Sequence, residues 1–263
     1  MRDPSRPVVV KLGGSVITDK EREFSVRRGV LRRLARELRG VEGMVLIHGG
    51  GSFGHPLARR YGLTQGLRGP KQLRGFAEVR RAMERLNLCV LEELGREGIP
   101  AVPVPPSACC VLEGGRIKRM ELEPLRRMME LGLLPVLYGD AVVDLKQGVN
   151  ILSGDRLAVH LALQLGAQRV VLGVDVDGVF TGDPKRDPRA ELLRVITPEE
   201  WKRRKPSFSS TGWDVTEGME GKVRELLGLA ERGIEAQIVN ASKRGVLGRA
   251  LRGDRSLGTL IRG

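Results

Sequence analysis

Apolar residues in this chain gather into short continuous runs that alternate with amphipathic stretches. The runs at 8–12 and 43–47 are rich in β-branched residues and have the length of buried strands. Between them, from Ser25 as the expected N-cap to a stop at Gly40, apolar positions recur on one helical face. Strand, glycine-rich turn, helix and strand in this order predict a right-handed βαβ unit. The expected fold class is therefore α/β.

The next part of the chain continues this alternation of helix and strand patterns. Helical spacing of apolar residues over 71–97 predicts one long amphipathic helix, and 133–137 again has the pattern of a buried strand. The proline-rich segment 100–110 between them is interpreted as a short strand followed by an ordered loop. These elements extend the α/β pattern beyond the first βαβ unit.

A second group of strand and helix patterns begins near residue 150. Its members are a hairpin that turns near 146–148, a helix that opens at Ser153 or Gly154, a strand early in 169–184, a helix over 221–232 and a strand over 236–239. A soft boundary between 139 and 154 divides the chain into an expected N-terminal lobe, 1–150, and an expected C-terminal lobe, 151–263.

The chain carries a formal charge of +13, from 45 lysines and arginines against 32 aspartates and glutamates. Such a charge favours nucleic acid, anionic membrane surfaces or phosphorylated small molecules as partners. Aromatic residues make up only 3%, and the basic residues are spread along the chain, so platforms for stacking nucleic-acid bases are scarce. No apolar stretch has the length of a signal or membrane-spanning segment. We therefore expect a cytoplasmic protein whose partner is neither nucleic acid nor a membrane.

Two glycine-rich segments follow the ends of two predicted strands: KLGGSVITDK at 11–20 and HGGGSFGH at 48–55. A lysine and several free backbone amides at a strand end form an edge that binds anions. Neither segment is a Walker A loop or a GxGxxG fingerprint. Because parallel neighbours bring these edges side by side, they fit a reaction between two phosphate-bearing molecules. The alternative for either segment is a purely structural role, as a strand that ends in a glycine turn without binding a ligand.

Histidines stand at both ends of the second glycine-rich segment. His48 is interpreted as a packing residue at the end of the strand. His55 follows the last glycine, where a protonated imidazole can donate a charge-assisted hydrogen bond to a phosphate. The sequence thus predicts different roles for the two rings.

The segments KLGGSVITDK, HGGGSFGH, ILSGD, DVDGVFTGDP and DVTEGMEGK, in this order, resemble the motifs of the amino acid kinase superfamily. The particular residues of these motifs are most similar to those of archaeal isopentenyl phosphate kinases. The resemblance implies a three-layer αβα sandwich with a largely parallel sheet, usually dimeric, that transfers the γ-phosphoryl group of ATP. Within the superfamily, a histidine that closes the second glycine-rich loop marks acceptors that already carry phosphorus. The implied reaction converts isopentenyl phosphate to isopentenyl diphosphate in isoprenoid biosynthesis.

The resemblance also implies roles for residues at the motif positions. The implied catalytic residues are Lys11, Lys20, His55, Asp155 and Lys222. The implied ATP-binding residues, drawn from both lobes, are Lys11, Gly13, Gly14, Ser15, Gly51, Asp175, Thr181, Asp183, Gly218 and Lys222. The implied residues around the acceptor phosphate, mostly in the N-terminal lobe, are Gly50, Gly54, His55 and Gly154.

Phosphoryl transfer between two anions depends on cations and oriented amides rather than on a side-chain nucleophile. Lys20 is the first choice for stabilising the transition state, and Asp155 is expected to orient lysines through salt bridges. A phosphate acceptor is already deprotonated near neutral pH, so Asp155 is not expected to act as a base. Without the motifs, Asp155 would be interpreted as an ordinary carboxylate at a helix N-terminus.

Two further expectations concern Mg²⁺ and the acceptor's tail. No cluster of acidic, histidine or cysteine residues has metal-ligand spacing, so Mg²⁺ is expected to arrive with ATP and no protein metal site is predicted. The helix at 71–97 offers an apolar face for an alkenyl tail, although such a stripe is more often core. Its residues are Phe76, Val79, Met83 and Leu86.

One position departs from the motif pattern, and the acceptor itself stays open. Glu217 stands where relatives more often have glycine, which adds a negative charge to the implied nucleotide loop. Another kinase of the same fold, acting on fosfomycin, acetylglutamate or a nucleotide such as UMP, is the nearest alternative. A basic nucleic-acid-binding or regulatory protein on this scaffold is the alternative from a different class.

Overall fold

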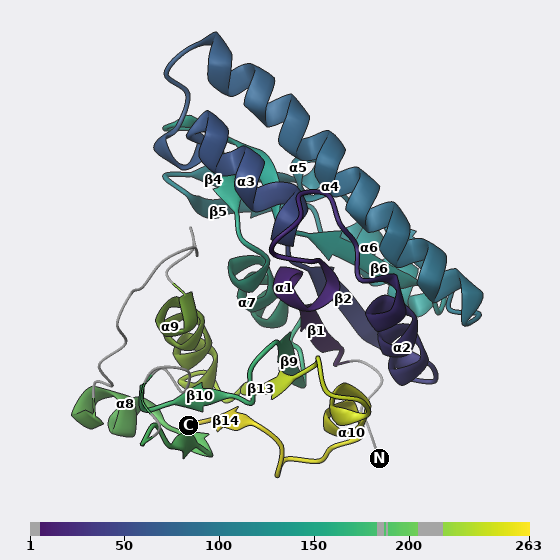
Figure 1. The fold of residues 1–263 in the computed structure, drawn as a ribbon, viewed down its shortest axis with the longest axis vertical. Helices are drawn as coiled ribbons and strands as arrows, with labels where there is room; N and C mark the ends of the chain where they lie inside the picture. The colour runs from purple at the N-terminus through teal and green to yellow at the C-terminus, as the bar shows by residue number, and fades with distance from the viewer. Residues whose placement is uncertain (1–5, 183–186, 188, 205–217) are drawn as a thin grey trace.

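An eight-stranded sheet forms the centre of the computed structural model, which describes residues 6–182, 187, 189–204 and 218–263 (Figure 1). The strand order is β12-β14-β13-β9-β1-β2-β6-β3. The strands are β1 (Val8–Leu12), β2 (Met44–His48), β3 (Ala101–Pro103), β6 (Leu134–Tyr138), β9 (Arg169–Val174), β12 (Val195–Ile196), β13 (Glu235–Asn240) and β14 (Thr259–Ile261). All neighbouring pairs are parallel except β13 and β14. The predicted α/β class with a largely parallel sheet is confirmed.

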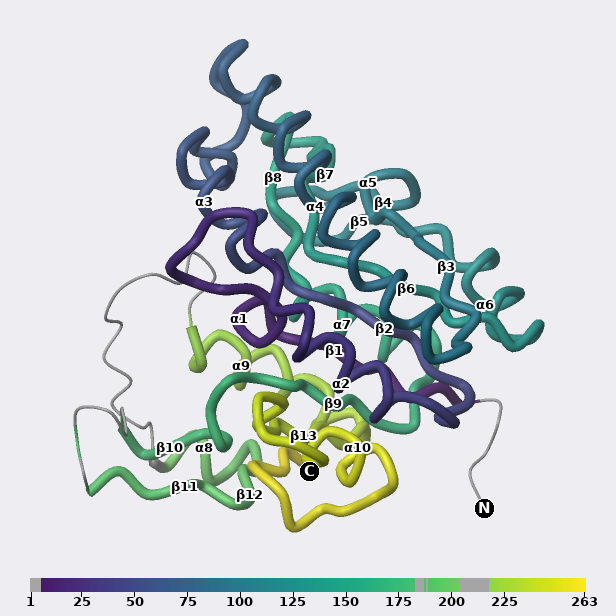
Figure 2. The backbone as a smooth tube through the Cα atoms, turned by 45° about the vertical axis from the view of Figure 1, so that its right-hand side comes forward, coloured from purple at the N-terminus to yellow at the C-terminus, as the bar shows by residue number. Residues whose placement is uncertain are grey.

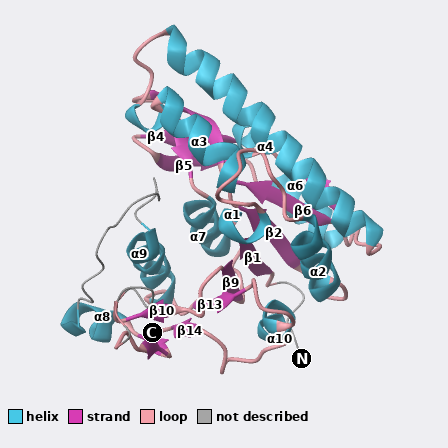
Figure 3. Cartoon of the chain, in the orientation of Figure 1, coloured by secondary structure: helices cyan, strands magenta, loops and turns pink. Residues whose placement is uncertain are grey.

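Helices cover both faces of this sheet, as Figure 3 shows. One layer contains α1 (Gly14–Ile17), α2 (Arg28–Leu38), α3 (Gly51–Tyr61), α4 (Pro70–Arg96) and α10 (Val246–Leu251). The other contains α6 (Glu123–Glu130), α7 (Gly154–Gln164) and α9 (Gly218–Ala230). Side chains alternate between the two layers along a strand, so Val8 and Val10 pack in the first core and Val9 in the second. The arrangement is the expected αβα sandwich.

A smaller four-stranded sheet lies at the end of the molecule that carries α3 and the start of α4 (Figure 2). Its order is β5-β4-β7-β8, from β4 (Cys110–Glu113), β5 (Arg116–Met120), β7 (Asp140–Asp144) and β8 (Gly148–Leu152). The remaining elements are η1 (Leu63–Gln65), α5 (Pro106–Cys109), α8 (Pro198–Arg204), β10 (Val179–Phe180) and β11 (Leu192–Leu193). None of the helices in the described ranges combines the length and apolar character needed to cross a membrane.

Most predicted elements are found within a few residues of their expected limits, with two corrections. Ser25 does not cap α2, which begins at Arg28 with Arg27 as its N-cap. The Ser25 carbonyl instead accepts a hydrogen bond from the Asp19 amide at 2.9 Å, which keeps this stretch extended. The proline-rich segment 100–110 holds a helical turn, α5, where only a strand and a loop were expected.

The strand register brings the predicted motifs to one edge of the large sheet. β1 pairs with β2 on one side and with β9 on the other, so Leu12 lies between His48 and Gly173. The glycine-rich segments therefore leave the sheet beside the loop that follows β9. Because this sheet runs through both expected lobes without a break, the limits 1–150 and 151–263 stay a prediction.

His48 is a core residue, as the sequence predicted. Its ring is fully buried, stacks on Tyr138 and hydrogen-bonds to the Gly49 carbonyl oxygen (3.1 Å) and the Asn87 side chain (3.2 Å). Burial, helped by the nearby Lys11 charge and opposed by these two hydrogen bonds, lowers the pKa of His48 from 6.5 to about 4. The fold therefore holds this imidazole in its neutral form.

We predict that His48 makes the fold sensitive to acid. Because the folded-state pKa of His48 is depressed, its neutral ring stabilises the fold above pH 6.5, and this stability is lost as the pH falls toward about 4. The loss from this group amounts to about 3 kcal/mol in the free energy of unfolding. Urea unfolding of the wild type and His48→Gln between pH 7.5 and 4 measures it. Equal pH slopes in the two proteins would contradict the prediction.

Candidate active site

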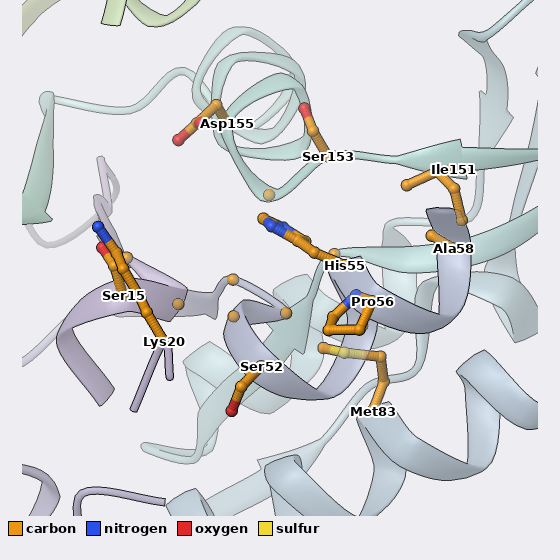
Figure 4. A pocket seen from close by; sticks show the side chains of 18 of the residues that line it. Ser15, Lys20, Ser52, His55, Pro56, Ala58, Met83, Ile151, Ser153 and Asp155 are labelled. Carbon is orange, nitrogen blue, oxygen red and sulfur yellow. The ribbon is translucent and has the colours of Figure 1, made fainter. Parts of the chain in front are cut away.

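A cavity of about 910 Å³ opens at the carboxyl ends of β1, β2, β6 and β9 (Figure 4). This is the edge of an open α/β sheet at which ligands bind. Most residues that the sequence analysis selected line this cavity. They are Lys11, Gly13, Gly14, Ser15, Lys20, Gly50, Gly51, Gly54, His55, Val79, Met83, Gly154, Asp155, Asp175 and Lys222.

None of the other selected residues that the structure describes lines the cavity. Leu86 is fully buried in the core and Phe76 packs against that core, and neither lines the cavity. The Thr181 hydroxyl oxygen accepts a hydrogen bond from the Glu191 amide at 3.0 Å, and Gly218 begins α9. Asp183 and Glu217 lie outside the described residues.

Backbone contact between the two glycine-rich segments explains their composition. A Cβ atom on Gly14 would lie 2.2 Å from the Gly51 nitrogen, and one on Gly51 would lie 2.1 Å from the Thr18 hydroxyl oxygen. Gly51 also has a φ of +47°, in the left-handed region that glycine adopts most easily. Because these positions carry no side chains, the turn from β1 into α1 can pack directly against the turn from β2 into α3.

Two long helices direct their N-termini toward the cavity. α3 begins at Gly51 and α7 at Gly154, and both residues line the cavity wall. The amides in the first turn of a helix and its dipole favour bound anions. Ser153 caps α7 by accepting a hydrogen bond from the Arg156 amide at 3.2 Å. The cavity thus combines two positive helix ends with its lysines.

Asp155 joins two lysines that come from different elements of the cavity wall. Its carboxylate lies 2.7 Å from the Lys11 ammonium and 3.4 Å from the Lys222 ammonium. Burial by itself raises the pKa of this carboxyl, but the two lysines outweigh burial and hold the pKa below its ordinary value. Asp155 is therefore ionised at neutral pH and fixes a β1 lysine and an α9 lysine in one cluster.

Lys20 forms a second, more exposed ion pair. Its ammonium lies 2.8 Å from the carboxylate of Asp175, the residue after β9, and 61% of the Lys20 side chain is exposed. Burial by itself raises the pKa of Asp175. Hydrogen bonds from Lys20 and Ser15 and the charge of Lys20 lower this pKa by more than burial raises it, so the net shift is downward. Lys20 is thus tied to the loop after β9 while remaining accessible to a ligand.

The wall around His55 is polar on one side and apolar on the other. His55 lies in the second turn of α3 and its ring projects into the cavity (Figure 4). Val79 and Met83 of α4 and Ile151 of β8 form the apolar side. A Cβ atom on Gly54 would lie 3.0 Å from the Met83 sulfur, so this glycine lets the thioether pack close to the histidine turn.

Sequence reasoning missed several residues of the cavity. Ala58 and Arg59 follow His55 by one helical turn, but the start of α3 inside the glycine-rich segment was not predicted. Ile151 lies on a strand whose pattern was read only as half of a hairpin, and no local signal marks it. Among the described residues, no group of three or more histidine, cysteine, aspartate or glutamate residues could hold a metal ion.

Known proteins are similar to this chain in both sequence and fold. The profile of the amino acid kinase family matches residues 6–240. An isopentenyl phosphate kinase from Methanothermobacter thermautotrophicus is 42% identical over 265 positions, which cover 97% of this chain and 99% of that protein. One from Thermoplasma acidophilum is 36% identical and covers 84% and 85% of the respective chains.

The structural comparison agrees with these sequence matches. A solved X-ray structure of isopentenyl phosphate kinase superposes with a TM-score of 0.85 at 40% identity, covering 97% of this chain and all of the other. The profile match spans both halves of the large sheet and all the described residues that line the cavity. The chain therefore belongs to the amino acid kinase family.

Proposed function

We propose that this protein transfers the γ-phosphoryl group of ATP to isopentenyl phosphate, giving isopentenyl diphosphate and ADP, a step of isoprenoid biosynthesis. One observation carries the proposal: a single cavity joins a lysine cluster and two helix N-termini to an apolar wall beside His55. An acceptor with a phosphate head and a short alkenyl tail fits this combination. The isopentenyl phosphate kinases that cover nearly the whole chain support the same acceptor.

In the proposed reaction, an oxygen of the acceptor phosphate attacks the γ-phosphorus in line with the leaving group. The bond from that phosphorus to the bridging oxygen breaks, and ADP leaves with the electron pair. Lys11 and Lys222 neutralise phosphate charge, and Lys20 stabilises the charge that develops on the transferring group. Asp155 holds the first two lysines and takes no proton, because the acceptor is already deprotonated.

The two substrates would occupy different parts of the cavity. On the ATP side we place the turn residues Gly13, Gly14, Ser15 and Gly51 with Asp175 and Lys222, while Thr181, Asp183 and Gly218 would complete the pocket around the nucleotide. On the acceptor side we place Gly50, Gly54, His55, Gly154, Val79 and Met83. Mg²⁺ would enter as part of the Mg-ATP substrate and keep most of its waters.

We also propose that the working protein is a homodimer in the cytoplasm of an archaeon. The archaeal sources of the two relatives with 42% and 36% identity support the origin. The cytoplasm is where ATP is available to a kinase, and dimers are usual in the family that the motifs resemble. The N-terminal lobe, 1–150, would bind the acceptor and the C-terminal lobe, 151–263, would bind ATP.

We expect isopentenyl phosphate to be the preferred acceptor. Purified protein with Mg-ATP should release ADP fastest, by kcat/KM, with isopentenyl phosphate, followed by dimethylallyl phosphate, because both place an apolar tail against Val79 and Met83. Fosfomycin, acetylglutamate and UMP serve as the competing acceptors. A higher kcat/KM with any of these three would overturn the acceptor assignment. No turnover, with salt-dependent binding to DNA or RNA, would favour a binding protein instead.

His55→Ala should lower kcat/KM for isopentenyl phosphate by about 100-fold, since one charge-assisted donor to phosphate is lost. The KM for ATP should change little, because we place His55 on the acceptor side. His160→Ala is the matched control, since His160 lies on α7 outside the cavity. Near wild-type turnover by His55→Ala would reject the role of this imidazole.

Lys20→Ala should lower kcat by about 100- to 1,000-fold while raising the KM for ATP much less, because Lys20 acts on developing charge. Lys118→Ala is the matched control: its side chain is 56% exposed and lies 3.4 Å from Glu113, an ion pair outside the cavity. A large rise in KM for ATP at nearly constant kcat would instead make Lys20 a nucleotide-binding residue.

A further inference from the structure

Lys20 is held by a loop, not by a helix or strand. We call residues 18–26 the strap; it connects α1 to α2, and a β-bridge between Thr18 and Val26 closes its two ends. Figure 2 shows this segment running from α1 past α3 before it reaches α2. The place of the Lys20 ammonium in the cavity therefore depends on what fixes the strap.

Phe24 is the unusual residue of the strap. Its φ is +56°, and no other non-glycine residue in the described ranges has a positive φ. A bulky L-residue is disfavoured in this region, so the surrounding contacts must impose the conformation. The residue is also 45% exposed, and it is one of the few aromatic residues of the chain, which make up only 3% of it. Burial of the ring alone does not explain why a phenylalanine stands here.

Two contacts fasten Phe24 to the first turn of α3. Its amide donates a hydrogen bond to the Ser52 carbonyl oxygen at 3.2 Å. Its ring meets the Phe53 ring edge to face, with centroids 5.6 Å apart and an angle of 85° between the planes. Such aromatic pairs are favourable beyond the area that they bury. The strap is thus anchored to the same helical turn that carries the glycine contact and leads to His55.

Ion pairs tie the strap at two other points. The Arg60 guanidinium on α3 donates to both Glu23 carboxylate oxygens, at 3.1 and 3.2 Å. Lys20 itself reaches Asp175, which follows β9 and also lines the cavity, at 2.8 Å. Exposed ion pairs contribute little and exchange readily. A phosphate that competes for Lys20 would break the second tie. The contacts of Phe24 would still hold the strap to α3, together with hydrogen bonds that the Ser52 amide donates to the Thr18 hydroxyl (3.0 Å) and the Ser52 hydroxyl donates to the Ser25 carbonyl oxygen (3.5 Å).

We propose that Phe24 is a positioning residue for phosphoryl transfer: its contacts with Ser52 and Phe53 lock the strap against α3 so that Lys20 faces the transferring group. The inference rests on the proposed function, because it takes Lys20 as the cation at that group. A flexible, exposed lysine needs such support, since misplacement by about 1 Å costs up to 100-fold in rate. These contacts hold the Phe24 backbone at its strained positive φ, which is locally unfavourable.

The first test compares Phe24→Ala, Phe24→Gly and Phe24→Tyr with the wild type. Loss of the ring should lower kcat by about 10- to 100-fold in the first two variants, with KM for ATP nearly constant. Phe24→Tyr keeps the ring and should retain activity. Phe24→Gly relieves the backbone strain, so it should melt roughly 2–4 °C above Phe24→Ala yet be no more active. Leu131→Ala, which truncates an exposed apolar residue outside the strap, is the control.

A double mutant tests whether Phe24 acts through Lys20. In a Lys20→Ala background, Phe24→Ala should lower kcat by less than about twofold, because the group that it positions is gone. Full additivity of the two effects would overturn the inference. Wild-type kcat in the Phe24→Ala single variant would overturn it as well.

Trypsin cleavage separates this inference from the proposed function, because it needs no turnover. Lys20 and Arg22 are exposed tryptic sites within the strap. Phe24→Ala should be cut at these sites roughly tenfold faster than the wild type, since the loop opens more often. Equal cleavage would remove Phe24 as an anchor even if the kinase is active. Faster cleavage in a protein that phosphorylates none of the acceptors would keep the anchor and reject the proposed function.

Discussion

The structure depends on the contact between two peptide backbones that carry no side chains. Gly14 lies so close to Gly51 that a methyl group at either position would collide with backbone or hydroxyl atoms. Any other residue would separate the turn after β1 from the turn after β2. Helices α1 and α3 would then move apart, and the first turn of α3 would lose its place beside the lysine cluster. The geometry of the cavity therefore begins with main-chain packing.

Electrostatics adds a second constraint to this frame. Lys11 is 5% exposed and Asp155 is 9% exposed, and one carboxylate faces two ammonium groups, so the cluster carries an excess positive charge in a mostly buried place. Uncompensated buried charge is unfavourable. A bound phosphate would supply the missing negative charge, and the helix N-termini at Gly51 and Gly154 would add to its attraction. The cluster is thus better matched to an anionic ligand than to solvent.

The sequence allowed six of the eight strands of the large sheet and most of the described cavity lining to be predicted, because these follow from local patterns, whereas the short strands β12 and β14 were not predicted. Continuous apolar runs mark the strands, and glycines mark the turns where β1 and β2 end. The start of α3 was not predicted because glycines are poor helix formers, and tertiary contacts rather than local propensity determine where this helix begins. Phe76 and Leu86 share a helical stripe with Val79 and Met83, yet periodicity does not tell which members of a stripe face a ligand and which face the core.

The three lysines among the described residues of the cavity lining differ in how they are held, and this difference bears on what each can do. Lys11 and Lys222 are fixed by a buried carboxylate, which suits cations that would neutralise phosphate charge throughout the proposed reaction. Lys20 is 61% exposed and sits on a loop, where its pair with Asp175 is open to competition from a phosphate. A cation that exchanges one anionic partner for another can follow the transferring group between two substrates. Such movement is useful only if the loop beneath it stays still, and a strained phenylalanine locked against α3 meets that requirement.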